Sequence, residues 1–167
     1  MLRYCAFWSV LVLFTASAAQ KPEPVAPLPP AEAVSSFVAF PQDCNANPPM
    51  VFGGKLLAEM DRAAGMATRR FLLASPCGAR DAVTIAINKV TFHAPARVKD
   101  LIVVTGRVVG AGAKSVTVRV TVEKEVEGKR ELLVDGEFVF VAYKLGTDDK
   151  KGRAIPHGLT MPGEKDK

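Results

Sequence analysis

The chain has 167 residues, of which 49% are hydrophobic and 23% are charged, and its formal net charge is +5. This length predicts one domain of ordinary size. The basic residues are scattered, with no stripe of Lys and Arg interleaved with aromatic residues, which argues against a nucleic-acid partner. The modest positive charge still favours an anionic small molecule as the ligand.

The first 18 residues have the pattern of a secretory signal peptide. Arg3 precedes an apolar run over residues 6–14, and residues 16–18 (Ala-Ser-Ala) supply the small side chains that a signal peptidase reads. The run is too short for a transmembrane helix. We expect cleavage after Ala18 and export, either to a periplasm or out of the cell. An uncleaved anchor is the alternative, as is a cytoplasmic protein that starts at a later residue.

Residues 19–34 follow as a linker rich in Pro and Ala. Residues 35–40 then predict a short first strand, and residues 41–51 form a loop rich in Asp, Asn and Pro. The next segment, 52–73, predicts a long helix that Pro76 and Gly78 end. Its apolar residues recur at helical spacing: Leu56, Leu57, Met60, Ala63, Ala64, Ala67 and Phe71.

Two cysteines, Cys44 and Cys77, remain after the signal peptide is removed. The predicted helix would hold them about 30 Å apart, which disfavours a disulfide between them. Neither lies in a spacing typical of metal ligands. We therefore expect two ordinary loop residues, no bound metal and no cofactor.

The rest of the chain predicts strands over residues 82–92, 101–109, 115–126 and 131–143, followed by a flexible C-terminal tail over 146–167. A lone apolar helix that precedes a run of hairpins must be covered by their sheet. The fold class is therefore α+β, with one long central helix wrapped by a five- or six-stranded antiparallel sheet. A free edge of that sheet would need a second subunit.

Asp61 is the unusual residue of the helix. It lies beside the apolar stripe, and no Lys or Arg stands one helical turn away to pair with it. Such a carboxylate is either hydrogen-bonded to another segment or kept for chemistry. Gly53 and Gly54 at the helix start would let a ligand or another backbone approach the first free N–H groups.

The order of these elements resembles the hotdog-fold acyl-CoA thioesterases of the ACOT type. The resemblance runs from about residue 35 to 145, and each motif is weak by itself while their order is fairly specific. The matching motifs are Pro41-x-Asp43-x-Asn45, Phe52-Gly53-Gly54, Met60-Asp61, Ala64-Gly65, Thr91-Phe92-His93-x-Pro95, Gly112-x-Lys114-Ser115 and the aromatic last strand Phe138–Ala142.

The resemblance implies a hotdog domain over 35–145 that hydrolyses acyl-CoA thioesters to free fatty acid and CoA. The site would lie between two subunits of a homodimer, or of a larger assembly of dimers. Asp61 would be the general base or the nucleophile, and the helix amides near Gly54 would stabilise the oxyanion. The resemblance also implies substrate contacts from Asn47, Gly53, His93, Lys114 and Ser115.

Each of these residues also has a structural interpretation. Asp61 could bind a loop N–H of the partner subunit, and His93 could be a turn residue at a strand end. Lys114 and Ser115 form a hairpin turn in either interpretation, and such a turn with a Lys can bind an anion.

Two departures from the family pattern leave an alternative open. The family usually has Asp or Asn two residues before the Phe of its FGG motif, whereas this chain has Met50 in a loop about one residue longer. Either Asn47 takes that role or the polar contact is lost. Lys114 replaces the usual Arg, which keeps the charge but loses bidentate binding of phosphate.

The predicted signal peptide is a second difficulty, because acyl-CoA is a cytosolic metabolite. The alternative function is an exported, non-catalytic hotdog module that binds an acyl chain or a thioester-like ligand. A different thioester substrate outside the cytoplasm is also open. Hotdog dehydratases rank last, because no histidine precedes the helix.

Overall fold

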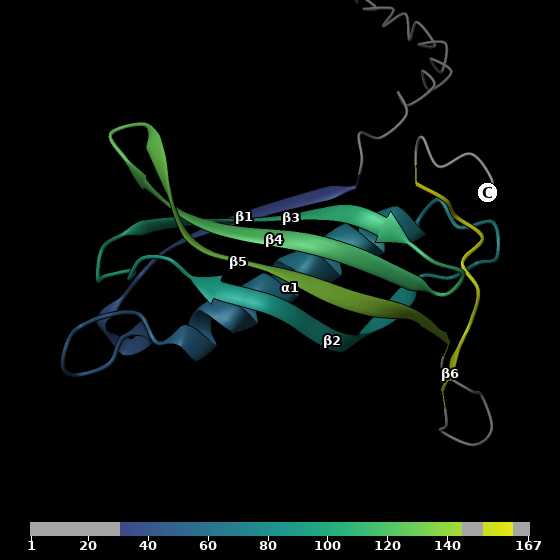
Figure 1. Ribbon diagram of the computed structural model, residues 1–167, viewed down its shortest axis with the longest axis horizontal. Helices are drawn as coiled ribbons and strands as arrows, with labels where there is room; N and C mark the ends of the chain where they lie inside the picture. Colours follow the sequence, from purple (N-terminus) through teal and green to yellow (C-terminus); the bar gives the residue numbers. More distant parts are fainter. Residues whose placement is uncertain (1–30, 145–151, 162–167) are drawn as a thin grey trace, which may run out of the picture.

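The computed structural model describes residues 31–144 and 152–161, and Figure 1 shows one long helix lying across a strongly curved sheet. The helix is α1 (Gly53–Leu72), and a short 3-10 turn, η1 (Pro41–Asp43), precedes it. The strands are β1 (Glu32–Val38), β2 (Asp81–Phe92), β3 (Leu101–Ala111), β4 (Ser115–Val126), β5 (Lys129–Lys144) and β6 (Arg153–Ala154).

All strand pairs are antiparallel, and the main path of the sheet runs β1-β3-β4-β5-β2. The short β6 pairs with β5 beyond the point where β4 begins, since Val141 pairs with Ser115 and Tyr143 pairs with Ala154. The six-stranded antiparallel sheet around one helix confirms the predicted fold class. It leaves β1 and β2 as the two edge strands.

The core lies between α1 and the concave face of the sheet. The helix buries residues at helical spacing, among them Leu56, Met60, Ala63 and Ala67. Gly106 on β3 allows a close approach, because a Cβ at that position would lie 2.8 Å from the carbonyl oxygen of Ala63. The small side chains of the helix and this glycine together let the helix lie directly on the central strands.

The predicted elements agree with the structure to within one to three residues at most ends. The helix is one residue shorter at each end, β4 has the predicted bounds, and β1 begins three residues earlier than expected. Cys44 and Cys77 are both free. The predicted signal peptide and most of the predicted linker fall outside the described residues.

The predicted flexible tail is wrong over residues 152–161. This segment pairs with β5 through β6 and then packs on the core through Ile155, His157, Leu159 and Met161. These four side chains are spaced two apart, as in an extended chain with one face inward. The Gly, Pro and charged residues around them hid this alternation in the sequence.

The edge strand β2 exposes an unusual amount of apolar surface. Val83, Ile85 and Ile87 are all exposed, and Phe92 at the end of the strand is 51% exposed. No other described strand pairs with the outer edge of β2. An open, apolar sheet edge of this kind invites a further chain.

Candidate active site between α1 and β2

Asp61 on α1 and Thr84 on β2 form the centre of the candidate site. The Thr84 hydroxyl donates a hydrogen bond of 2.7 Å to Oδ1 of Asp61. Thr84 faces the helix because it pairs with Phe140, whose side chain lies in the core. Asp61 is partly exposed, and none of the ion pairs formed by the described residues includes it. The carboxylate is therefore held by one neutral donor and remains open on its other side.

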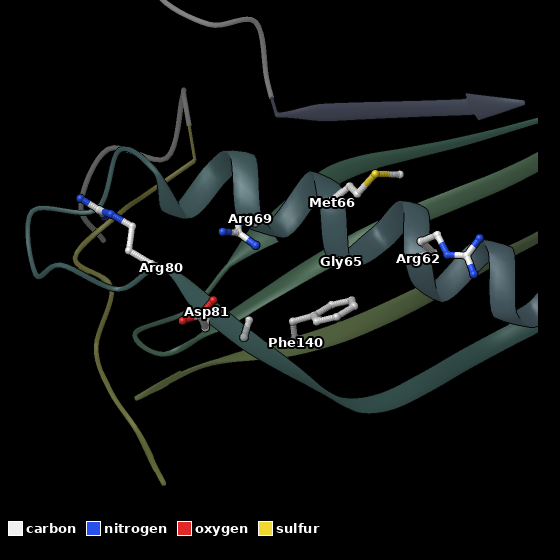
Figure 2. A pocket seen from close by; sticks show the side chains of 8 residues that line it. Arg62, Gly65, Met66, Arg69, Arg80, Asp81 and Phe140 are labelled. Carbon is white, nitrogen blue, oxygen red and sulfur yellow. The ribbon is translucent and has the colours of Figure 1, made fainter. Parts of the chain in front are cut away.

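A cleft of about 290 Å³ lies between the second half of α1 and the start of β2, where Arg62 and Ala82 line it but Asp61 and Thr84 do not. Figure 2 shows Phe140 between the helix and the strand, with Gly65 and Met66 on the helix above it. The cleft thus combines an apolar floor with basic residues at its rim: Arg62, Arg69 and Arg80.

Two of the three rim arginines have partners elsewhere. Arg62 donates to both carboxylate oxygens of Glu59, and Arg80 donates to the carbonyl of Leu72 at the end of the helix and to that of Ala79 in the loop after it. In Figure 2 the guanidinium of Arg80 points away from the cleft. Arg69 is the rim arginine for which no such partner is found within the described residues.

The N-terminal turn of α1 presents two backbone donors. The amides of Gly53 and Gly54 have no acceptor among the described residues, as is usual in the first turn of a helix. Phe92 lies against Gly53, and the ring of Phe52 lies over Gly54 so closely that a Cβ there would come within 2.4 Å of it. The amides therefore lie beneath two exposed aromatic rings.

The loop before the helix is fixed by an ion-pair network. Lys55 Nζ lies 3.0 Å from Glu59 and 3.5 Å from Asp43 in η1. The hydrogen bond to Glu59 raises the pKa of Lys55 above its ordinary value of 10.5, and Asp43 acts in the same direction although partial burial opposes them. Asn47 lies on the exposed part of this loop, while Met50 is partly buried and its carbonyl accepts from Asn45.

The other predicted contact residues lie in two further places. Lys114 and Ser115 form the turn between β3 and β4, at the opposite end of the helix from Gly54. His93 follows β2 on the outer face of the sheet, where its Nε2 lies 2.6 Å from Oδ1 of Asp135. One subunit therefore does not bring the predicted residues into a single cluster around Asp61.

Thr84 and His157 are two residues that the sequence does not single out. Thr84 is one of several threonines on the described strands, and its link to Asp61 depends on a register that the sequence does not give. The sequence predicts a flexible tail around His157, yet this residue is completely buried. The alternation of apolar residues around it was the signal that could have identified it.

The described ranges contain no cluster of His, Cys, Asp and Glu suited to a metal ion. In the same residues, no helix is both long and apolar enough to cross a membrane.

The family model of the thioesterase superfamily matches residues 49–131. An uncharacterized acyl-CoA thioester hydrolase from Zymomonas mobilis is 35% identical over 136 residues, which are 80% of this chain and 83% of that protein. A match of this extent establishes the family of the chain.

Solved structures of enzymes with this architecture are also similar. The acyl-CoA hydrolase from Staphylococcus aureus, in complex with butyryl coenzyme A, has a TM-score of 0.64 at 25% identity. The match covers 77% of this chain and 73% of the chain of that enzyme. The hexameric thioesterase from Yersinia pestis has a TM-score of 0.61 at 28% identity, and the match covers 78% of this chain and 99% of that one. The Staphylococcus aureus enzyme was also solved as variants in which an asparagine, an aspartate or a threonine is replaced by alanine.

Proposed function

The chain belongs to the thioesterase superfamily, among its acyl-CoA thioester hydrolases, and from this premise we propose that it hydrolyses acyl-CoA with Asp61 as the reacting carboxylate. The observation that carries the proposal is the hydrogen bond between Thr84 and Asp61, whose sequence neighbour Arg62 lines the cleft. The hydroxyl of Thr84 orients the carboxylate and leaves its second oxygen without a hydrogen-bond partner among the described residues. The residue types replaced in the Staphylococcus aureus variants include this same pair, an aspartate and a threonine.

In the proposed reaction Asp61 takes a proton from water, and the water oxygen attacks the thioester carbonyl carbon. The C–S bond then breaks, and Asp61 returns the proton to the leaving thiolate of CoA. Attack by Asp61 itself, through a mixed anhydride that water hydrolyses, gives the same products. Turnover in ¹⁸O-labelled water separates the two routes, because attack of water on the anhydride at the Asp61 carboxyl adds mass to the peptide that holds Asp61.

The spacing along α1 favours oxyanion donors and a carboxylate that come from different subunits. Gly54 and Asp61 are seven residues apart on one helix, which places them about 10 Å apart along its axis. An oxyanion donor must lie about 3 Å from the carbonyl oxygen, whereas Asp61 must contact the carbonyl carbon directly or through the attacking water, and this separation on one helix is poorly suited to both contacts. We propose that the Gly53 and Gly54 amides of one subunit act with the Asp61 of another.

A second copy of this chain beside β2 would provide this arrangement. The edge of β2 is unpaired and apolar, and it adjoins the face of α1 that carries Asp61. A two-fold axis at this edge reverses the direction of the partner helix, so its N-terminal turn approaches the carboxylate. The hexameric state of the Yersinia pestis enzyme supports an assembly built from such dimers.

The two ends of the substrate suit two parts of the surface. The apolar floor of the cleft, with Met66, Ala82 and Phe140, suits an acyl group. The turn with Lys114 suits the phosphates of CoA, because Lys114 is exposed and the amides of Ala113 and Lys114 have no acceptor within the described residues.

A thiol-release assay with acyl-CoAs of several chain lengths tests the proposal. The Asp61→Ala variant should lower kcat by about 10²- to 10⁴-fold, the range for a lost general base. Asp81→Ala is a matched control, since it removes another carboxylate at the rim of the same cleft. Equal activity of Asp61→Ala and wild type, with both folded by circular dichroism, would remove Asp61 from the mechanism.

An exported, non-catalytic binding module is the second candidate. The apolar Met50 in the loop before the helix favours it, as does the proposed signal peptide over residues 1–18. This candidate predicts saturable binding of an acyl ligand without thiol release, unchanged in Asp61→Asn. N-terminal sequencing of the mature protein tests the export part, with Ala19 as the expected first residue.

A further inference from the structure

The turn between β3 and β4 is held by β5 and by the C-terminal segment. The amide of His157 donates to the carbonyl of Ala113 at 3.2 Å, and the amide of Ala142 on β5 donates to the carbonyl of Lys114 at 2.8 Å. The His157 ring adds a third contact, with Nε2 lying 3.2 Å from the carbonyl oxygen of Ser115. Figure 1 shows the C-terminal segment, in yellow, passing this turn.

His157 is itself fixed on every side. The Ser75 hydroxyl donates to the His157 carbonyl at 2.6 Å, and the ring of Phe71 meets the imidazole edge-on with centroids 5.9 Å apart. The amide of Leu159 donates to Nδ1 at 3.1 Å, so the ring proton is on Nε2. The neutral imidazole therefore donates to the carbonyl of Ser115.

These contacts satisfy the carbonyl groups of the turn but not all of its amides. Its carbonyls from Ala113 to Ser115 all have donors from inside the molecule, whereas the amides of Ala113 and Lys114 have no acceptor in the parts of the chain that the structure describes. The exposed Lys114 side chain extends from the same turn. Two free amides and an ammonium group on one rigid turn make an anion site whose geometry depends on the groups behind it.

We propose that His157 is a positioning residue that holds the Lys114 turn in the geometry that contacts the phosphates of CoA. This inference rests on the proposed function, since it requires an acyl-CoA substrate that reaches Lys114. It predicts an effect on recognition of the nucleotide end of the substrate and not on the chemistry at Asp61. The C-terminal segment thereby takes part in substrate binding without touching the substrate.

The test compares two substrates that share one thioester, an acyl-CoA and the same acyl group on N-acetylcysteamine, which lacks the nucleotide. In the purified full chain, His157→Phe keeps a ring beside Phe71 but loses both side-chain hydrogen bonds. We expect it to raise KM for acyl-CoA about five- to tenfold at unchanged kcat, and to leave kcat/KM for the short thioester unchanged. His157→Gln can donate to Ser115 and accept from Leu159, so it should restore KM to within about twofold of wild type.

Lys114→Ala is run in parallel and should raise KM for acyl-CoA by at least as much as His157→Phe does. Equal losses on both substrates in His157→Phe would show a purely structural role and overturn the proposal, as would a Lys114→Ala variant that behaves like wild type. Absence of turnover of either substrate by the wild-type protein would instead overturn the proposed function. If His157→Phe does not fold, Ser75→Ala replaces it, because it removes the hydroxyl that holds the His157 carbonyl, together with a long contact from the Ala79 amide.

Discussion

The two ends of α1 are built in opposite ways. At the C-terminal end, Leu72 and His157 are completely buried, and residues 152–161 cover the helix. At the N-terminal end, the rings of Phe52 and Phe92 are 58% and 51% exposed beside two amides without acceptors among the described residues. A single chain therefore buries the C-terminal end of its helix but leaves the N-terminal end exposed.

The two ends of the helix therefore serve different purposes: the closed end stabilises the fold, and the open end carries groups proposed to act in catalysis. The closed end consists of packed apolar groups and satisfied hydrogen bonds, which is what a folded core requires. The open end has exposed apolar rings, free helix amides and a carboxylate held by one hydroxyl. Groups of this kind cost stability in an isolated chain, and the proposed second subunit gives them a use.

Paired substitutions at the two ends give the largest expected difference. Leu72→Ala at the closed end should lower the free energy of unfolding by about 2–5 kcal/mol, because it empties a completely buried site. Phe52→Ala at the open end should change the stability of a single subunit by less than about 0.5 kcal/mol but weaken self-association. Urea unfolding and analytical ultracentrifugation of both variants measure this, and equal losses of stability would contradict the contrast.

A smaller effect is expected when the hydroxyl at Asp61 is removed. Thr84→Val keeps the shape of the side chain but loses the donor to the carboxylate, and a hydrogen bond to a charged group contributes about 1.5–3 kcal/mol. We expect kcat to fall by about one to two orders of magnitude with little change in stability. Thr84→Ser retains the hydroxyl and is the matched control. A Thr84→Val enzyme with wild-type kcat would show that the contact does not serve catalysis.

The smallest effect is expected in the network that holds the loop at the open end. Lys55→Met removes the ion pairs to Glu59 and Asp43, and such partly exposed pairs contribute at most about 1 kcal/mol. Because the pKa of Lys55 is raised above 10.5, this contribution is complete below that pH and is lost as the pH rises through the folded-state value. Thermal unfolding of both proteins should therefore differ at pH 8 and converge at strongly alkaline pH.

Much of the fold could be predicted because its patterns are local. The apolar spacing along 53–72 and the alternation along 115–126 each fix an element and its buried face. The segment 152–161 was missed because its alternation is interrupted by Gly and Pro and includes a histidine at the most buried position. Histidine is a polar residue type, which predicts exposure, but the ring nitrogens of His157 form hydrogen bonds inside the fold.

The site could be predicted only in part, because its groups come from distant segments. Asp61 was conspicuous as an unpaired carboxylate on its own helix. The partner hydroxyl of Thr84 became visible only once β2 was placed beside the helix, in a register interrupted by a bulge between Thr84 and Ala86. Asn47 and His93 do not lie beside Asp61 within one subunit. Their substrate contacts therefore remain predictions.

Subunit complementation tests the central claim most directly. Asp61→Ala removes the carboxylate, and Gly54→Pro removes the backbone donor in the first helical turn, where the exposed Phe52 ring must move aside for the proline ring. Each variant alone should be inactive, but co-expressed subunits would form mixed dimers with one intact site, from the Gly54 amide of one chain and the Asp61 of the other. The account predicts recovery of about a quarter of the wild-type activity for random two-fold pairing. Mixed dimers without activity would contradict it and place both groups in sites formed within one chain.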